Sequence, residues 1–598
     1  MADAFQRHWR PLTILFWIGT AIYLVWNGWG RPGMDGIQGF GLGDTDDNMR
    51  IMQVRAWMNE GQGWYDLRQY RLNPPDGLDI HWSRLVDLPI IFLWNLFGLF
   101  MDGAAAERWA VAIAPILPLL VAMGALALAF RRLLSPYAYW LALALMVCAG
   151  SALSMFSPLR IDHHGWQLAM LAVAVAGLAD PDKARGGITL GIASALSLVI
   201  GLEMLLYLAL AGAAVGLSWV ADRGEARRLA AYGASFAGAT ALGFLIFASN
   251  ANWGPVCDAL SPVWLSVVLV AGAVAVALAW FSPSSMWMRL LAAALGGAVV
   301  AGMYVLFWPD CVGRLERVPA ELDQLWLRNV REAMPVWRHG LSTTIAIATL
   351  PVIGLIGYIT ILWRSRRDGD LFARWAAIAY LAAVALSLLL WQTRAAAASQ
   401  LLALPGAAAL GWVLIIWFQR QRLMLVRVLG VFAAFAFVSG GIVGQVSGWW
   451  DENEPQSPGR QAINNANWRC PMAQFLRPVA LQPRGLVMTF VDLGPRLVTL
   501  THHDAIAGPY HRNSQAILDV MHFFRGDEAA ARQIAEARRL DYVLICPNMS
   551  ESTIYRADTP NGFYAHLSNG RVPDWLEQVQ LPAESPFRMW RVRRSTSP

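Results

Sequence analysis

Charged side chains are scarce in this sequence. Lysine, arginine, aspartate and glutamate make up 15% of the 598 residues, while 56% are hydrophobic, and the mean hydropathy is +0.41. Soluble globular proteins carry about 25% charged residues. This composition therefore excludes a soluble globular enzyme and makes lipid the natural solvent of the chain.

Internal repeats and low-complexity tracts are also missing from the sequence, which excludes a solenoid and a compositionally biased disordered chain. Long apolar runs recur instead between Pro11 and Val446. A hydrocarbon core of about 30 Å needs roughly 20 apolar residues per helix. We therefore expect about thirteen transmembrane helices, at 11–29, 108–130, 135–155, 166–180, 187–203, 204–221, 229–248, 260–281, 290–308, 343–363, 373–391, 396–418 and 423–446.

Arginine and lysine set the expected orientation, because basic residues near short loops stay in the cytoplasm. With the N-terminus in the cytoplasm, each cytoplasmic connection is basic; the residues are Arg7, Arg10, Arg131, Arg132, Lys183, Arg185, Arg223, Arg227, Arg228, Arg289, Arg364, Arg366, Arg367, Arg420 and Arg422. The external segments are then the loops 30–107, 156–165 and 309–342 and everything after Val446. We expect a multi-pass protein of a bacterial inner membrane whose C-terminal domain is periplasmic.

Only five cysteines occur in the chain, and Cys148 alone lies within an expected helix. The other four fall on the external side, where an oxidising compartment permits disulfides. We expect Cys257 to pair with Cys311 and Cys470 with Cys546. The alternative is four unpaired thiols.

The segment 447–598 is polar and contains proline. Short apolar runs predict strands at 486–491 and 542–546, and an alanine- and glutamate-rich stretch predicts a helix at 527–540. We therefore divide the chain into a transmembrane domain, 1–446, and a soluble α/β domain, 447–598.

Three carboxylates, Asp44, Asp46 and Asp47, stand within four positions in the first external loop. Such a cluster repels itself unless a cation or a hydrogen-bond network compensates it. A solvated turn is the alternative interpretation.

The short external turn 156–165 contains Asp162, His163 and His164. In an extended turn, side chains two positions apart point the same way, and aspartate and histidine both bind divalent cations. Ionisable residues at a membrane boundary indicate a functional site. We expect Asp46, Asp162 and His164 to bind one divalent metal, Mn²⁺ or Mg²⁺, which suits this oxygen-rich set better than zinc does. Such a metal would stabilise a leaving phosphate or pyrophosphate.

These two motifs resemble those of a known family. Residues 46–61, followed by 70–75 and 77–82, look like the first external loop of the GT-C oligosaccharyltransferase catalytic subunits, and the turn 162–164 is similar to the Asp-His-His form of that family's second acidic motif. The resemblance implies a GT-C membrane fold and gives Asp46 a catalytic role. Asp44, Asp47 and His163 become candidates for binding acceptor or substrate.

Two further segments match the family. Asn329-Val330-Arg331-Glu332 is similar to its Thr-Ile-x-Glu motif, which implies that Glu332 is catalytic and helps to hold the acceptor; the alternative is an ordinary amphipathic helix at 321–334. Arg394 resembles the arginine that this family holds against the phosphates of its donor lipid. The forked, permanently charged guanidinium of arginine suits phosphate binding. A lipid-headgroup contact is the alternative for Arg394.

The C-terminal part matches the family least. Trp450 and Asp451, in Trp449-Trp450-Asp451, are similar to an acceptor-recognition motif, but Glu452 and Asn453 depart from it. Tryptophan also gathers at membrane interfaces for purely physical reasons. The departure puts a protein acceptor in doubt.

His511 and Arg512, in a loop of the soluble domain, have two interpretations. They grip phosphate or acceptor sugar, or they form a hydrogen-bonded structural turn. The soluble domain does not resemble the oligosaccharyltransferase globular domain.

The resemblance implies a glycosyltransferase that uses a polyprenyl phosphate or pyrophosphate sugar donor in an inverting, metal-assisted displacement. The acceptor is a protein or, equally, a glycolipid or an envelope polysaccharide. A lipid-linked sugar transporter or flippase is the alternative of a different class, but transporters carry their ionisable residues near the bilayer midplane. We expect membrane lipid as a partner and no nucleic acid.

Overall fold

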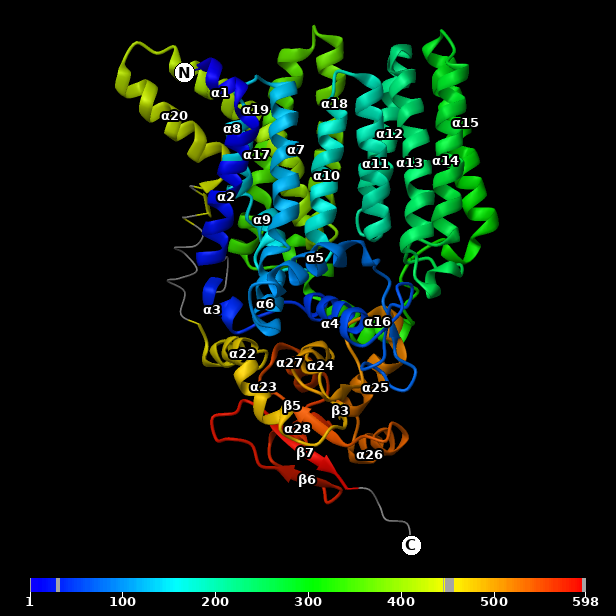
Figure 1. Ribbon diagram of the computed structural model, residues 1–598, viewed down its shortest axis with the longest axis vertical. Coiled ribbons are helices and arrows are strands. Elements are labelled where there is room, and N and C mark those ends of the chain that lie inside the picture. Colours follow the sequence, from blue (N-terminus) through cyan, green and yellow to red (C-terminus); the bar gives the residue numbers. More distant parts are fainter. Residues whose placement is uncertain (1, 28–32, 442, 445, 447–455, 594–598) are drawn as a thin grey trace.

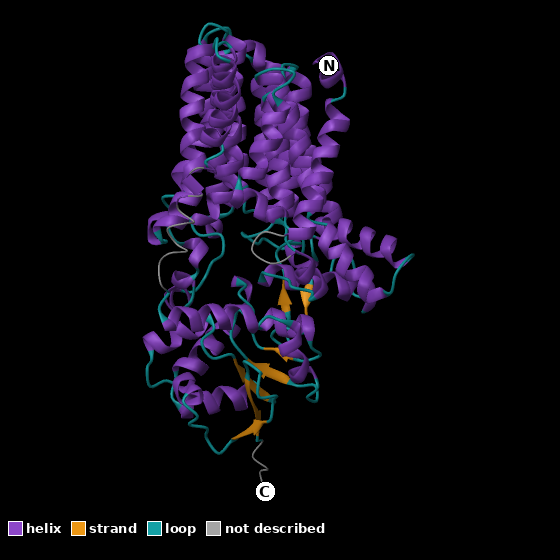
Figure 2. Cartoon of the chain, turned by 90° about the vertical axis from the view of Figure 1, so that its left-hand side faces the viewer, coloured by secondary structure: helices purple, strands orange, loops and turns teal. Residues whose placement is uncertain are grey.

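The computed structural model describes residues 2–27, 33–441, 443, 444, 446 and 456–593. Figure 1 shows an elongated molecule with a bundle of long helices at one end and a mixed domain of helices and strands at the other. The N-terminus lies at the far end of the bundle, and the chain ends at the tip of the mixed domain. In the turned view of Figure 2 the strands lie outside the bundle.

Each of the thirteen predicted spans coincides with an apolar helix, or a pair of helices, of the bundle. Within the described residues, nine helical segments are long and apolar enough to cross a membrane, one pair is bent, and three apolar helices are shorter. The bundle consists of α2 (Trp9–Asn27), α6 (Gly103–Ile113) with α7 (Ile116–Leu133), α8 (Tyr139–Cys148) with α9 (Gly150–Leu153), α10 (His164–Leu178), α11 (Lys183–Ile200), α12 (Leu205–Ala221), α13 (Ala226–Phe247), α14 (Pro262–Phe281), α15 (Met286–Phe307), α17 (Leu341–Ser365), α18 (Gly369–Leu388), α19 (Ala396–Gln419) and α20 (Met424–Val438).

The predicted span 135–155 is bent by 81° between α8 and the short helices that follow. Ala149 interrupts the helix with φ −82° and ψ 75°. The interruption leaves backbone N–H groups without their helical partners. One of them, the N–H of Ser151, donates to Oε1 of Gln400 on α19 at 2.8 Å. A polar side chain from a neighbouring helix thus satisfies backbone that lipid would leave unpaired.

Small residues let α17 and α19 approach each other closely. A Cβ atom on Gly357 would lie 1.8 Å from the carbonyl oxygen of Gly406 on the facing helix. The Tyr358 hydroxyl donates to the carbonyl oxygen of Leu402 at 2.7 Å across the same contact. Close packing through small residues is the usual basis of helix association in membranes, where lipid is as apolar as the side chains.

A layer of short elements separates the bundle from the mixed domain (Figure 1). It comprises α3 (Gly33–Gln38), α4 (Thr45–Asn59), β1 (Arg68–Gln69), β2 (Leu78–Asp79), α5 (Asp87–Gly98) and α16 (Ala320–Leu325). The segment 321–334, for which a single amphipathic helix was one expectation, forms α16 and then short 3-10 turns. Glu332 therefore lies on an exposed turn rather than on a continuous helix.

The C-terminal domain has the α/β character that the sequence predicts. Its sheet has the order β4-β3-β5-β7-β6, parallel from β4 to β5 and antiparallel from β5 to β6. The strands are β3 (Leu486–Met488), β4 (Asp504–Ala505), β5 (Tyr542–Ile545), β6 (Leu576–Val579) and β7 (Arg588–Val592). The helices are α22 (Pro458–Arg469), α23 (Ala473–Ala480), α24 (Gly494–Leu500), α25 (Ser514–Arg525), α26 (Glu528–Ala537), α27 (Ser550–Asp558) and α28 (Phe563–Ser568). The sequence places the domain boundary between residues 446 and 447. The segment 447–455, which begins at this boundary, lies outside the described residues.

Both cysteine pairs expected from the sequence are disulfides in the structure. Cys257 bonds Cys311, with Cα atoms 5.3 Å apart, and Cys470 bonds Cys546. The first ties the segment before α14 to the end of α15, and the second ties α22 to the end of β5.

Glu551 is a buried acid inside the C-terminal domain, 4% exposed. Its carboxylate accepts the backbone N–H groups of Val491 and Asp492, both at 2.9 Å, and the Tyr555 hydroxyl also donates to it. Burial, reinforced by the charge of Asp492, raises the pKa of Glu551 to about 8. The side chain thus fixes the turn that follows β3.

We expect the free energy of unfolding to fall as the pH rises from 4.5, the ordinary pKa of glutamate, to about 8. In that window the folded protein holds a proton that the unfolded chain has lost, and one such proton contributes at most about 1.4 kcal/mol per pH unit. Thermal unfolding of the full chain in detergent between pH 5 and 9 measures the slope. Glu551→Gln should flatten it, whereas Glu577→Gln, at an exposed position on β6, should not; an unchanged slope in Glu551→Gln would contradict the assignment.

Candidate functional site

The N-terminus of α4 carries the acidic cluster of the first external loop. Asp44 is the N-cap of this helix, and its Oδ1 accepts the backbone N–H of Asp46 at 3.1 Å. Carboxylates are favoured here by the unpaired N–H groups and the helix dipole. Asp47 is only 1% exposed, whereas the Asp44 side chain is 33% exposed, so the cluster reaches from the surface into the interior.

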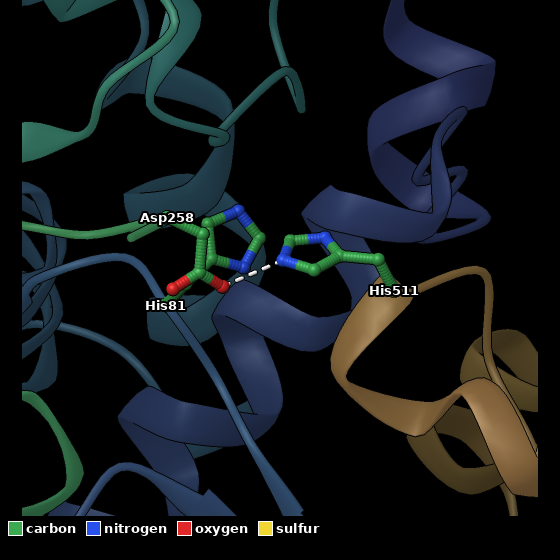
Figure 3. A group of neighbouring side chains, drawn as sticks. All are labelled: His81, Asp258 and His511. Carbon is green, nitrogen blue, oxygen red and sulfur yellow. Dashed lines mark hydrogen bonds and ion pairs between the residues drawn. The ribbon is translucent and has the colours of Figure 1, made fainter. Parts of the chain in front are cut away.

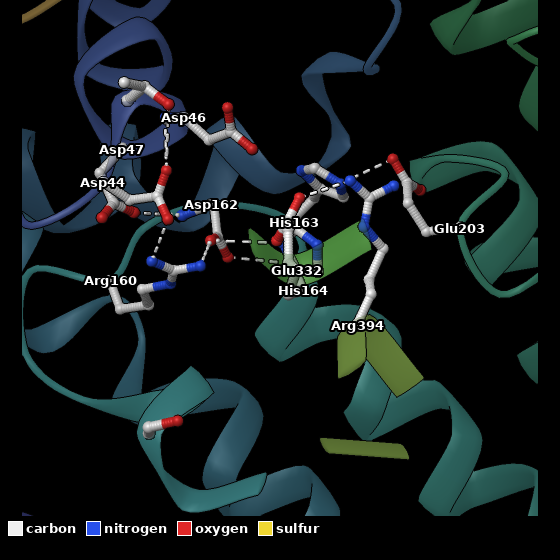
Figure 4. A network of polar contacts seen from close by, with 12 residues as sticks. Asp44, Asp46, Asp47, Arg160, Asp162, His163, His164, Glu203, Glu332 and Arg394 are labelled. Atoms are coloured by element: carbon white, nitrogen blue, oxygen red, sulfur yellow. Dashed lines mark hydrogen bonds and ion pairs between the residues drawn. The ribbon is translucent and has the colours of Figure 1, made fainter. Parts of the chain in front are cut away.

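Arg160 joins this cluster to the turn before α10. Its guanidinium bonds Asp44 at 2.5 Å and Asp162 at 2.8 Å, and Figure 4 shows it between the two carboxylates. Asp47 Oδ1 completes the junction by accepting the backbone N–H of Asp162 at 3.0 Å. Burial alone would raise the pKa of Asp162, but Arg160 and the neighbouring histidines hold it well below its usual range.

Asp46 is the uncommitted carboxylate of the cluster. Within the described part of the chain its side chain accepts no hydrogen bond and forms no ion pair, and no dashed line reaches it in Figure 4. Burial, followed by the charge of Asp44, raises its pKa well above the ordinary value. Four carboxyl groups here lie beside two basic groups, the guanidinium of Arg160 and the imidazole of His164. Burial alone would lower the pKa of His164, but Asp162 raises it to about 9.

The two histidines of the turn have different partners. His164 Nδ1 lies 3.3 Å from Asp162 Oδ2, while His163 Nε2 bonds Glu203 at 2.8 Å. Gln167 also donates to Glu203, at 2.6 Å. Burial disfavours the charge of Glu203, but His163 keeps its pKa well below the ordinary value. Glu203 follows α11 and belongs to no motif, so sequence reasoning does not mark it as a residue of this site.

A divalent cation fits the chemistry of this site. Asp162 Oδ2 and His164 Nδ1 are buried without a well-formed hydrogen bond, and Asp46 is uncommitted. The ligand atoms of Asp46, Asp162 and His164 do not form a group within 4.8 Å of one another among the described residues, and Asp162 is paired with Arg160. The expected ligand set is therefore present in one cluster but not drawn together.

Glu332 and Arg394 pair with each other. Arg394 donates to the Glu332 carboxylate, and the two side chains are 41% and 57% exposed. Thr393 fixes the neighbouring backbone by donating to the carbonyl oxygen of Glu332 at 3.3 Å. No contact of the described residues joins this pair to Asp46, although Arg394 lies within electrostatic range of Glu203.

The C-terminal domain closes over the acidic cluster. The Tyr510 hydroxyl donates to the carbonyl oxygen of Thr45 at 3.0 Å, and Arg496 donates to Asn48 at 3.2 Å. Trp82 stands between this domain and the turn, with ring centroids 5.8 Å from Tyr510 and 4.8 Å from His163. The domain thus contributes one wall of the site.

Asp492 is a further carboxyl group that the domain directs toward this cluster. Desolvation and the charge of Asp44 raise its pKa to about 6. It follows β3 and comes directly after the run 486–491 that the sequence predicts as a strand, and no motif marks it.

His511 and Arg512 both bond Asp258, which precedes α14, at 2.6 Å. They thus link the C-terminal domain to the bundle, and their role in gripping phosphate or acceptor sugar stays a prediction. Trp450 and Asp451 lie outside the described residues.

No protein-family model and no curated protein sequence matches the chain. Among solved structures, it is similar to the oligosaccharyltransferase AglB of Archaeoglobus fulgidus in complex with an inhibitory peptide and a dolichol-phosphate, with a TM-score of 0.66 and 15% identity, over 99% of this chain and 75% of that chain. A structure of the Archaeoglobus fulgidus oligosaccharyltransferase tethered with an acceptor peptide containing the NVT sequon gives a TM-score of 0.66 at 16% identity, over 91% and 69% of the chains. The complex of that enzyme with Zn and sulfate gives 0.59 at 16% identity, over 89% and 67%. At these identities the likeness shows the fold alone, and the predicted membrane fold, similar to that of the oligosaccharyltransferase structures, is confirmed.

Removal of the Arg160 side chain should destabilise the protein. Losing one partner of a buried ion pair costs about 3–5 kcal/mol, and because the Arg160 side chain is 23% exposed we expect Arg160→Ala to cost about 2 kcal/mol. Mn²⁺ should recover part of the loss, since a cation would offset the same carboxylates. Thermal unfolding in detergent, with and without Mn²⁺, measures both effects.

The matched control for this experiment is Arg484→Ala, because Arg484 is 65% exposed and pairs with Asp504 far from the cluster. Its melting temperature should barely change and should not respond to Mn²⁺ differently from the unmodified protein. Equal behaviour of the two variants would show that Arg160 does not hold the cluster together.

Proposed function

We propose that this chain is a membrane glycosyltransferase that transfers a sugar or oligosaccharide from a polyprenyl phosphate or pyrophosphate donor to an acceptor. The observation that carries the proposal is the uncommitted carboxylate of Asp46, held at the N-terminus of α4 in the same cluster as Asp162 and His164. The fold shared with archaeal oligosaccharyltransferase, solved with a dolichol-phosphate, supports a lipid-borne donor. A mono- or a pyrophosphate linkage is compatible with these residues.

A divalent metal, Mn²⁺ or Mg²⁺, would be held by Asp46, Asp162 and His164. When bound it would supply charge stabilisation for a leaving phosphate. One structure of the Archaeoglobus fulgidus enzyme holds Zn and sulfate, which supports a divalent cation in a protein of this fold. Arg160 would keep Asp44 and Asp162 in place around the ligands.

Arg394 would bind the donor's phosphate. Its guanidinium is accessible and paired only with an exposed carboxylate, Glu332, so a phosphate can replace that partner at low cost. Arginine suits this exchange because its forked donors match phosphate oxygens. Glu332, released from Arg394, would be free to hold the acceptor.

Asp46 would act as the base when the acceptor is a hydroxyl. Its carboxylate removes the acceptor proton as the acceptor oxygen bonds the anomeric carbon, and the bond from that carbon to the phosphate oxygen breaks with its electron pair. A single displacement inverts the anomeric centre. A raised pKa places Asp46 closer to neutral pH, where a general base is most effective.

The acceptor is a protein, a glycolipid or an envelope polysaccharide. The archaeal enzyme has been solved with a peptide carrying an NVT sequon, which supports a peptide acceptor. The sequence departs from the family's motif at Glu452 and Asn453, which makes a glycolipid or an envelope polysaccharide at least as well supported as a protein acceptor. Asp44, Asp47, His163 and Asp492 line the cluster and would contact the acceptor or the donor sugar.

The site would face the periplasm across a bacterial inner membrane, with the N-terminus cytoplasmic. Two observations support this orientation. The chain's N-terminus and C-terminal domain lie at opposite ends of the bundle, and both disulfides lie outside the apolar helices, on segments expected in an oxidising compartment. A flippase is disfavoured, because the ionisable cluster lies at the ends of helices and not at mid-bundle.

Asp46→Asn should reduce transfer of a radiolabelled polyprenyl-linked sugar in membranes by at least about 100-fold, a typical contribution of general base catalysis. The melting temperature should stay within about 2 °C or rise, because the substitution removes an unpaired charge. Asp76→Asn, in the same loop at an exposed position, is the matched control and should retain full activity. Full transfer by Asp46→Asn would refute its role, and lipid movement without cleavage of the sugar–phosphate bond would identify a flippase instead.

A further inference from the structure

Three potential metal ligands from distant parts of the chain meet between the bundle and the C-terminal domain. His81 follows β2, Asp258 precedes α14, and His511 precedes α25 in the C-terminal domain. One ligand atom from each residue lies within 4.8 Å of the other two, and Figure 3 shows the three side chains converging. The proposed catalytic ligands Asp46, Asp162 and His164 are not members of this group.

Asp258 is held in a rigid setting. It follows Cys257, whose disulfide with Cys311 ties the segment to the end of α15. The indole of Trp264 donates to the carbonyl oxygen of Cys257 at 2.8 Å. Arg512 bonds both oxygens of Asp258 at 2.6 Å. Such outer contacts orient a carboxylate ligand and leave it little freedom.

His81 is the member without a committed partner. Among the described residues its ring makes no hydrogen bond, and the Glu203 carboxylate lies 3.9 Å from its Nε2. Burial and the neighbouring His511 hold its pKa well below the ordinary value, so the imidazole is neutral and its lone pair is available. A small cavity with room for about one water molecule borders His81 and Asn252.

His511 needs two adjustments to become a ligand. Its Nε2 bonds Asp258 Oδ2 at 2.6 Å, so the proton of that hydrogen bond must move to Nδ1. The two atoms must also separate to about 3.3 Å, the spacing of two ligands of one tetrahedral ion, while Arg512 continues to bond Asp258. Neutral histidine changes between these tautomers without any net change of charge.

We propose that His81, Asp258 and His511 bind a divalent transition-metal ion, zinc by its ligand chemistry, which fastens the C-terminal domain to the membrane bundle. Two imidazoles and one carboxylate form a three-ligand set that zinc favours, with a water from the cavity as the fourth ligand. The site is separate from the proposed catalytic metal and does not depend on the proposed function. Because the ligands come together only in the folded chain, binding would stabilise the docked arrangement.

Zinc titration of the full-length protein in detergent, after chelation, tests the proposal. All variants are made in the Asp46→Asn protein, in which the other candidate metal site is weakened. This parent protein should bind one zinc equivalent, with a rise in melting temperature. His81→Ala and His511→Gln should each bind zinc at least about 100-fold more weakly, since even outer-shell changes cost 10–100-fold. His502→Ala, an exposed histidine of the same domain, should bind as its parent does.

Asp258 itself is left unchanged in these variants, because its loss would strip Arg512 of a buried partner. If a histidine variant fails to fold, Co²⁺ binding to the Asp46→Asn protein decides the matter through the visible absorption of a tetrahedral site with nitrogen ligands. Zinc binding that survives both histidine substitutions overturns the proposal. Two other results also overturn it. One is the loss of the bound zinc equivalent on Asp46→Asn substitution alone, and the other is the absence of any tetrahedral Co²⁺ spectrum.

Discussion

Arg160 compensates carboxylates that would otherwise repel each other in a buried setting. Its guanidinium bonds Asp44 and Asp162, and through them it joins the start of α4 to the turn before α10, which are 116 positions apart in sequence. Asp47 adds a hydrogen bond to the same turn. Without this positive charge, the two acidic segments could not occupy one cluster in a medium of low dielectric constant.

The position of α4 follows from this junction. On one side α4 is joined to the turn before α10, and on the other it receives Tyr510 and Arg496 from the C-terminal domain. The acidic cluster therefore lies between two rigid bodies, with Trp82 filling the space between Tyr510 and His163. A reactive donor bound there would be shielded from water on the external side, which limits hydrolysis during transfer.

The junction between the domains is itself polar. Arg512 and His511 bond Asp258, and Arg55 donates to the backbone of Thr499 at 2.7 Å. Polar contacts of this kind orient a domain but contribute modestly to its affinity, because each group loses hydration when it is buried. A metal ion at His81, Asp258 and His511 would add the binding energy that such contacts lack, on the same side as both disulfides.

The sequence alone determined that the chain is a membrane protein, where its apolar spans lie, and that its C-terminal domain is α/β. It also marked the two acidic motifs, at 44–47 and 162–164. Hydropathy and short motifs are properties of contiguous segments, so they survive without any knowledge of the fold. Tertiary structure alone decided that Ala149 bends a span, that Glu332 pairs with Arg394, and that Arg160 pairs with both Asp44 and Asp162. It also brought Glu203 to His163 and His81 to His511. These pairings join segments that are distant in sequence, and their partners are chosen by how helices and domains dock, a constraint that no local pattern records.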